Sequence, residues 1–209
     1  MEATIRSARA AGVFKSFHVL TDAPIDGCEC YDGSCLDMVG GLHKLSALKA
    51  GIAKLNYEYF VWIEPGSQFR HNPPDPIRAL SRSPIHVPLE TPRPLDSSSS
   101  SLIAIENLLA QCGVRRPIYQ TGGEFWIVAR TAVDTVCELA SFLWQTAKKH
   151  DISPNAPMAL AYCMQMLCAF PQKHTIEANS ELWSPGPLNP PQSTAAIVYP
   201  RVAESHGAA

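Results

Sequence analysis

The chain has 209 residues, of which 46% are hydrophobic and 17% charged, so a sizeable buried core is expected rather than wholesale disorder. Seventeen Lys and Arg against nineteen Asp and Glu give a formal charge of -2, without the basic excess of a dedicated nucleic-acid-binding protein. No apolar run reaches the roughly 18–20 residues of a membrane span, and the N-terminus lacks the apolar segment of a signal peptide. These properties predict one soluble, cytoplasmic domain over residues 1–209.

Short helices and strands alternate in the N-terminal third. Residues 2–11 favour a helix that ends at Gly12, because glycine is the usual residue of a left-handed helix cap. An apolar run predicts a buried strand at 17–22, and a second short strand is predicted at 27–31. Between residues 42 and 55, apolar residues recur three or four positions apart with lysines between them, which indicates an amphipathic helix.

Strand and helix signals continue to residue 167. Two continuous apolar runs predict buried strands at 59–63 and 125–129, and a further strand is predicted at 85–89. Helices are predicted at 77–81, 102–111 and 134–150, and the Ser153-Pro154 start signal predicts another that reaches residue 167. Two prolines and five successive serines predict a mobile loop at 91–101. The Pro-rich tail from residue 184 is expected to be irregular, apart from a strand at 196–199.

This alternation predicts an α/β fold, a three-layer sandwich around a mostly parallel mixed sheet. The strands at 17–22, 59–63 and 125–129 are expected to be neighbours in that sheet, since none has a polar face to give to water. Ligands bind outside the carboxyl ends of the strands in such sheets. Three polar strand ends are therefore expected to converge: Thr21 with Asp22, residues 64–68, and residues 120–124.

Seven cysteines are present, at positions 28, 30, 35, 112, 137, 163 and 168. The cluster at 28, 30 and 35 lacks the second Cys or His pair that a zinc knuckle uses. The remaining four lie in apolar helical segments, where cysteine behaves as a small hydrophobic residue. All seven are expected to be reduced and free of metal.

The order of these segments resembles that of nucleotide-sugar glycosyltransferases of the GT-A fold. The family's "HVLTD" strand is matched by residues 18–22, and its "Y-x-V-x-W-x-D-x-D-x-x-F" segment by residues 59–69 (YFVWIEPGSQF). Its sugar-facing strand is matched by residues 119–130 (YQTGGEFWIVAR), and its "D-E-P-A-L-x-Y" helix start by residues 155–162 (NAPMALAY). The resemblance implies the three-layer fold above and a nucleotide diphosphate sugar as donor.

The resemblance also implies a cation site, from which this sequence departs. In the family two aspartates of the D-x-D motif bind Mg²⁺ or Mn²⁺, which bridges the donor's diphosphate. Here Glu64 stands at the first position, and Gly66, which has no side chain, stands at the second. Asn155 replaces the acidic start of the later helix. Since sixteen residues precede Phe17, the family's first nucleotide-binding strand is expected to be absent from them. Either the chain is a fragment or its nucleotide pocket is built differently.

The predicted site combines the strand ends with the resemblance. Glu64 and Glu124 are the candidate catalytic carboxylates, and Glu64 is also the candidate metal ligand. The candidate substrate-binding residues are Asp22, Ser67, Gln68, Thr121, Gly122, Gly123 and Asn155. The alternatives are a solvated strand-end carboxylate and a glycine pair that only supplies positive φ. No tightly bound cofactor is expected, only Mn²⁺ or Mg²⁺ held weakly together with a nucleotide.

Three hypotheses fit these observations. The first is an enzyme that transfers a sugar from a nucleotide diphosphate sugar to a hydroxyl acceptor, mainly by positioning both and stabilising the leaving group. The second is a non-catalytic domain of the same fold that binds a sugar, a nucleotide or a protein partner. The third is an α/β domain for an unrelated small molecule.

Overall fold

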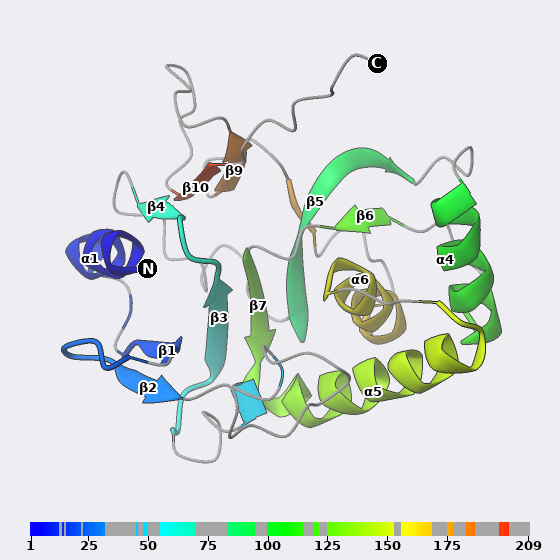
Figure 1. Ribbon diagram of the computed structural model, residues 1–209, viewed down its shortest axis with the longest axis horizontal. Coiled ribbons are helices and arrows are strands. Elements are labelled where there is room, and N and C mark those ends of the chain that lie inside the picture. Colours follow the sequence, from blue (N-terminus) through cyan, green and yellow to red (C-terminus); the bar gives the residue numbers. More distant parts are fainter. Residues whose placement is uncertain are drawn as a thin grey trace.

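The computed structural model describes residues 1–12, 14, 16–21, 23–31, 45, 48–49, 55–69, 83–94, 100–114, 119–121, 125–152, 156–168, 175–177, 183–186 and 197–200 (Figure 1). These ranges contain both helices and strands, so the predicted α/β class is confirmed. The strands between residues 59 and 94, and those between residues 175 and 200, follow one another within these ranges without the predicted alternation. The predicted helix at 77–81 lies outside them, and the one at 42–55 is described only at Leu45, Leu48 and Lys49, all of which are helical.

A five-stranded sheet occupies the middle of the molecule (Figure 1). Its strands are β3 (Tyr59–Ile63), β5 (Ile85–Pro94), β6 (Tyr119–Thr121), β7 (Phe125–Ala129) and β8 (Thr175–Glu177). β3 and β7 pair antiparallel along their whole length, from Tyr59 opposite Ala129 to Ile63 opposite Phe125. β7 and β6 pair antiparallel with successive parts of β5, whereas β8 runs parallel to it.

The prediction of a mostly parallel sheet is therefore wrong for these five strands. It rested on the continuous apolar runs of β3 and β7, which are typical of parallel strands covered on both faces. Such runs report burial on both faces and carry no information about strand direction. The predicted neighbourhood of β3 and β7 is confirmed.

The first predicted strand has a different partner from the one expected. β1 (His18–Leu20) pairs in parallel with β2 (Glu29–Tyr31), and among the strands that the structure describes these two form a sheet of their own. The prediction that it neighbours β3 within one sheet is therefore wrong. Its apolar residues indicate a buried strand, but three residues do not determine which edge they pair with.

The predicted loop at 91–101 is shorter at both ends. β5 continues to Pro94, α4 (Ser100–Gln111) begins at Ser100, and residues 95–99 lie outside the described part of the chain. The register of β5 with β6 shifts between Leu89 and Pro94. Proline has no N–H to donate to a neighbouring strand, so it is tolerated where the pairing is irregular. The prolines of β5 therefore do not end the strand.

The tail contributes two strands to a third sheet. β10 (Ile197–Pro200) pairs antiparallel with β4 (Gln68–Phe69) and parallel with β9 (Trp183–Gly186). The strand predicted at 196–199 is thus confirmed with a shift of one residue. The expectation of irregular structure is wrong for β9, whose Pro185 had argued against a strand.

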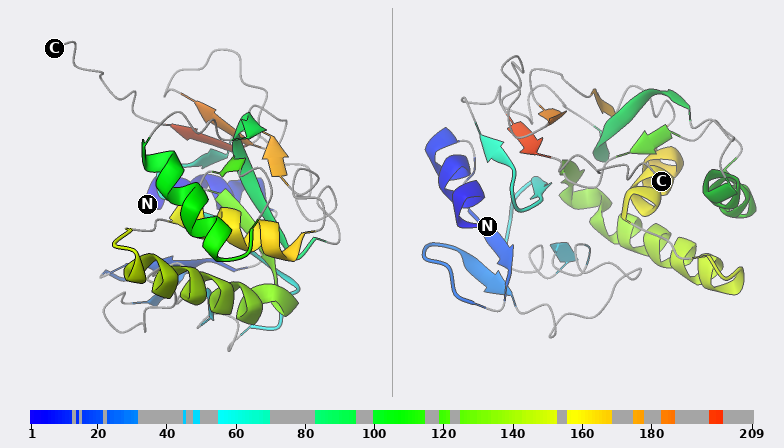
Figure 2. Two further views of the ribbon diagram at one scale, coloured as in Figure 1. Left: turned by 90° about the vertical axis from the view of Figure 1, so that its right-hand side faces the viewer. Right: turned by 45° about the horizontal axis from the view of Figure 1, so that its top comes forward.

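Alternate residues of the sheet face two apolar clusters. Trp126 and Val128 face a large cluster with Ile85 and Val87, built from α4, α5 (Val133–Lys149) and α6 (Ala156–Leu167), which gather on one side of the sheet (Figure 2). Phe125 and Ile127 face a smaller cluster on the other side. This alternation is the two-residue period of a strand. No helix within the described ranges is long and apolar enough to cross a membrane.

Candidate functional site

The predicted site residue Glu64 follows β3 directly. Ile63, the last residue of β3, lies opposite Phe125, so Glu64 leaves the sheet at the edge where β7 begins. The chain then turns through Gly66 at φ 101, a left-handed conformation that glycine adopts without strain. The backbone N–H of Ser67 and its hydroxyl both donate to the Glu64 carbonyl, at 3.2 and 2.9 Å, and close the turn before β4.

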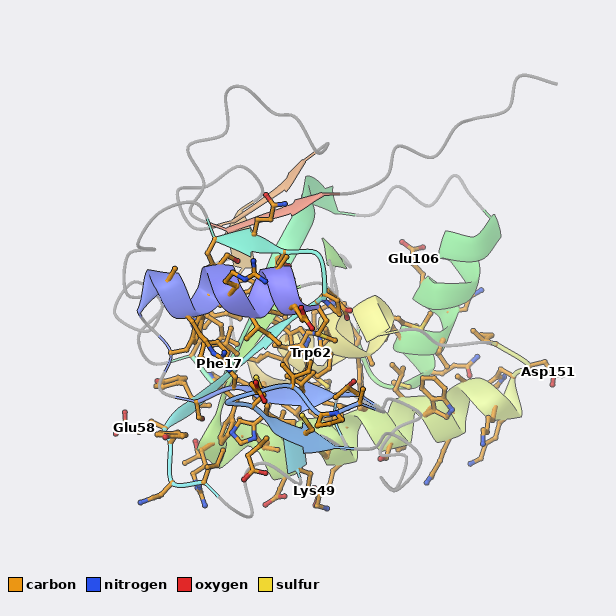
Figure 3. All side chains as sticks on the ribbon, turned by 60° about the vertical axis from the view of Figure 1, so that its left-hand side comes forward. Phe17, Lys49, Glu58, Trp62, Glu106 and Asp151 are labelled. Carbon is orange, nitrogen blue, oxygen red and sulfur yellow. The ribbon has the colours of Figure 1, made fainter. Side chains whose placement is uncertain are left out.

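The Glu64 carboxylate is anchored to the apolar face of the sheet. Trp62 Nε1 donates to Glu64 Oε1 at 3.1 Å, because residues two apart on a strand share a face. The Trp62 ring stacks on Trp126, its cross-strand partner, with centroids 6.2 Å apart and an angle of 20° between the planes. Trp126 is only 1% exposed. The indole of Trp62, labelled in Figure 3, thus links a half-buried carboxylate to the core.

Helix α1 (Glu2–Ala11) packs on this turn. Thr4 Oγ1 accepts a hydrogen bond from the Gly66 N–H at 2.9 Å, and Ser7 Oγ accepts one from the Phe69 N–H at 3.3 Å. The buried residues of α1 are Thr4, Ile5 and Ala8. No local pattern in the sequence predicts this contact, because it joins segments 62 residues apart.

The other end of α1 is tied to the loop before β2. Arg9 Nη2 donates to the Asp26 carbonyl and to Cys28 Sγ, the latter at 3.2 Å, and its guanidinium lies 5.5 Å from the centre of the Phe17 ring. Gly27 has φ 69, and a Cβ there would lie 2.7 Å from Arg9 Nη2. The conformation favours glycine at this position, and a Cβ would displace the Arg9 guanidinium from its hydrogen bonds.

A groove of about 410 Å³ lies between α1 and this loop. It is lined by Glu2, Ile5, Arg6, Arg9, Pro24, Ile25 and Asp26. Two guanidinium groups and two carboxyl groups line it, so it carries no net charge that would favour an anionic ligand. None of the predicted site residues that the structure describes lines this groove, and we do not assign the site to it.

The structure gathers three predicted residues in the turn. Glu64 is half-buried, Ser67 is 1% exposed with its hydroxyl used inside the turn, and Gln68 is exposed at the start of β4. Thr121 is the last residue of β6, opposite Leu89. The other predicted site residues, Asp22, Gly122, Gly123, Glu124 and Asn155, lie outside the described residues.

The described residues of the turn do not fit a divalent cation. Mg²⁺ and Mn²⁺ take oxygen ligands, whereas the turn offers one carboxylate, which already accepts from the Trp62 indole. Gly66 presents an N–H donor, and the Ser67 hydroxyl points its hydrogen at the Glu64 carbonyl. Within the ranges that the structure covers, no three His, Cys, Asp or Glu side chains lie close enough together to hold a metal.

The cysteines of the core are not candidate nucleophiles. Burial raises the pKa of the Cys163 thiol far above its ordinary value, and it raises that of Cys137 to about 11. The thiolate is the reactive form of cysteine, so both thiols are inert at neutral pH. The six described cysteines form no disulfide, and Cys35 lies outside the described residues.

Comparisons with known proteins bear on the fold. No family model matches the chain, and no curated protein matches it in sequence. A solved structure, the galactosyltransferase LgtC in complex with donor and acceptor sugar analogs, is similar with a TM-score of 0.51 and 9% sequence identity. The match covers 96% of this chain and 82% of that chain. At this identity the likeness shows the fold alone, and the chain has a glycosyltransferase-like fold.

Proposed function

We propose that this protein transfers a sugar from a nucleotide diphosphate sugar to a hydroxyl acceptor. The observation that carries the proposal is Glu64, a carboxylate held at the carboxyl end of β3 within a glycosyltransferase-like fold. Binding and catalytic residues are frequent in loops that a rigid scaffold positions, and Glu64 lies in such a loop directly after β3. The similar structure was solved with donor and acceptor sugar analogs, which supports the same class of ligand for this chain.

Glu64 is suited to recognise a hydroxyl group. A carboxylate accepts hydrogen bonds only, and its bonds from neutral donors are stronger than those between two neutral groups. The Trp62 indole fixes one of its oxygens, so the side chain is oriented before a ligand arrives. In the proposed reaction Glu64 orients a sugar or acceptor hydroxyl, or takes the acceptor's proton as a general base. The proposed site includes Asp22, Glu124 and Asn155, for which the sequence resemblance is the support.

A non-catalytic binding domain of the same fold is the second candidate. It is favoured by Gly66, which stands where the resembling family carries an acidic metal ligand, and whose N–H is bonded to Thr4. A protein that has lost this ligand can still bind a sugar or a nucleotide. The two candidates agree on binding and differ only in whether a bond is broken.

A thermal-shift screen of nucleotide sugars, with and without Mn²⁺, tests the binding that both candidates share. A ligand at a hundred times its Kd stabilises the fold by about 2.7 kcal/mol, a rise in Tm of roughly 5–10 °C for a chain of this size. Release of the nucleoside diphosphate is then measured with that donor and a panel of hydroxyl acceptors. Acceptor-dependent release supports transfer, and binding without release supports the second candidate. No shift with any nucleotide sugar contradicts transfer and also contradicts a non-catalytic domain that binds nucleotide sugars.

A further inference from the structure

Two backbone N–H groups after β3, one in the turn and one in β4, are bound by hydroxyls 62 residues earlier in the chain. The Gly66 N–H donates to Thr4 Oγ1, and the Phe69 N–H donates to Ser7 Oγ. The Ser7 hydroxyl in turn donates to the backbone carbonyl of Thr4 at 2.9 Å, which holds the Ser7 side chain in place on α1. Thr4 is 6% exposed, which leaves little room for water to replace its hydroxyl.

Four side chains order the turn and the start of β4. Thr4 binds the turn at Gly66 and Ser7 binds β4 at Phe69, while the Ser67 hydroxyl closes the turn from within and Trp62 fixes the Glu64 carboxylate. Where a strand-end turn carries two carboxylates, a bound cation can supply this order by joining them. Here the second of those positions is Gly66, and the group that meets it is a hydroxyl from α1.

We infer that Thr4 and Ser7 are positioning residues that hold the Glu64 turn in place of a bound divalent cation, so that this strand end works without one. The inference follows from the groups at the turn. The Gly66 N–H is a donor. The three hydroxyls, of Thr4, Ser7 and Ser67, already take part in hydrogen bonds where a cation would need oxygen ligands. The role of this turn in sugar transfer rests on the proposed function, whereas the contacts of Thr4 and Ser7 are independent of it. Replacing either hydroxyl loosens the turn, and adding Mn²⁺ does not tighten it again.

Amide hydrogen exchange tests the positioning role residue by residue. In Thr4→Val, which keeps the shape of the side chain and removes the hydroxyl, exchange of the Gly66 amide is expected to rise about two- to tenfold. Thr4→Ser, which restores the hydroxyl, is expected to exchange like the wild type, and Ser7→Ala is expected to accelerate Phe69. The amide of Val128 in β7 serves as the reference for global unfolding. Unchanged Gly66 exchange in Thr4→Val, relative to Val128, would overturn the inference.

Electron paramagnetic resonance of free Mn²⁺ tests the claim that this strand end does not bind a divalent cation. Wild type and Glu64→Gln are each titrated with Mn²⁺, alone and with a nucleoside diphosphate, and neither is expected to take up more Mn²⁺ than the nucleotide does by itself. Uptake by the wild type that Glu64→Gln abolishes would overturn the inference. Neither measurement requires a sugar to bind or be transferred, so their failure is distinguishable from failure of the proposed function.

Discussion

Raising the pH from 8 to 10 should destabilise the folded protein through Cys137 on α5. Its thiol is 3% exposed, and burial raises its pKa from 9.0 to about 11, with Asp134 and Glu138 adding to the rise and Lys49 opposing it. The unfolded chain loses this proton near pH 9 while the folded chain keeps it. The unfolded state then binds fewer protons, so stability falls as the pH rises.

The two pKa values set the size of the effect. The stabilisation from the protonated thiol is fully present below pH 9 and is lost as the pH rises toward 11. Between pH 8 and pH 10 the loss is about 1.3 kcal/mol for this one group, and it approaches about 2.7 kcal/mol above pH 11. Burial also raises the pKa values of Cys163 and Tyr162, so these two groups also lower the free energy of unfolding as the pH rises.

Urea unfolding at pH 8 and pH 10 isolates the contribution of Cys137. Cys137→Ala removes the titrating group, and the free energy of the cavity it leaves is the same at both pH values and cancels. The drop in unfolding free energy is therefore expected to be about 1.3 kcal/mol smaller in Cys137→Ala than in wild type. Val136→Ala, at a neighbouring buried position, should keep the wild-type drop. An equal drop in all three proteins would refute the buried, protonated thiol.

Two further predictions concern α1 and the thiols. Gly27→Ala should lower the Tm more than Gly113→Ala: both have positive φ, which costs about 1–2 kcal/mol for alanine, but only at Gly27 would a Cβ meet Arg9, at 2.7 Å. Equal losses, measured by calorimetry, would contradict the close packing of Arg9. Cys28, which is half-buried, should be alkylated by iodoacetamide in the native protein well before Cys163, which is 1% exposed. Mass spectrometry gives the order, and simultaneous labelling would argue against the buried position of Cys163.

Local pattern was enough to predict the described α-helices and the strands β3 and β7, whereas β4, β8 and β9 were not predicted. The pairing of the strands required information that the pattern does not hold. The apolar run of β3 was predicted with its observed bounds, and Gly12 caps α1 at φ 69 as expected. Strand direction could not be predicted, since a strand buried on both faces has the same composition in either direction. The extent of β5 was missed because its prolines lie where the ladder is irregular.

The local parts of the candidate site could likewise be predicted, whereas its contact with a distant segment could not. Glu64 at a strand end follows from the abrupt stop of an apolar run, which the sequence displays. Its partner Trp62 is local, two residues away, and follows from strand geometry once the strand is known. The contact of Thr4 with Gly66 joins segments 62 residues apart, and no local pattern reports such a contact.

Titration of a nucleotide sugar into two matched variants tests the central claim, that Glu64 marks the ligand site, most directly. Glu64→Gln removes the charge at the carboxyl end of β3, and Glu58→Gln removes one just before its amino end, where Glu58 is exposed and lies away from Trp62 (Figure 3). Hydrogen bonds to a charged group contribute roughly 1.5–3 kcal/mol, so Glu64→Gln should weaken binding by between about tenfold and a hundredfold. Glu58→Gln should bind like the wild type. Equal affinity of all three proteins for the nucleotide sugar would contradict the placement of the site at this strand end.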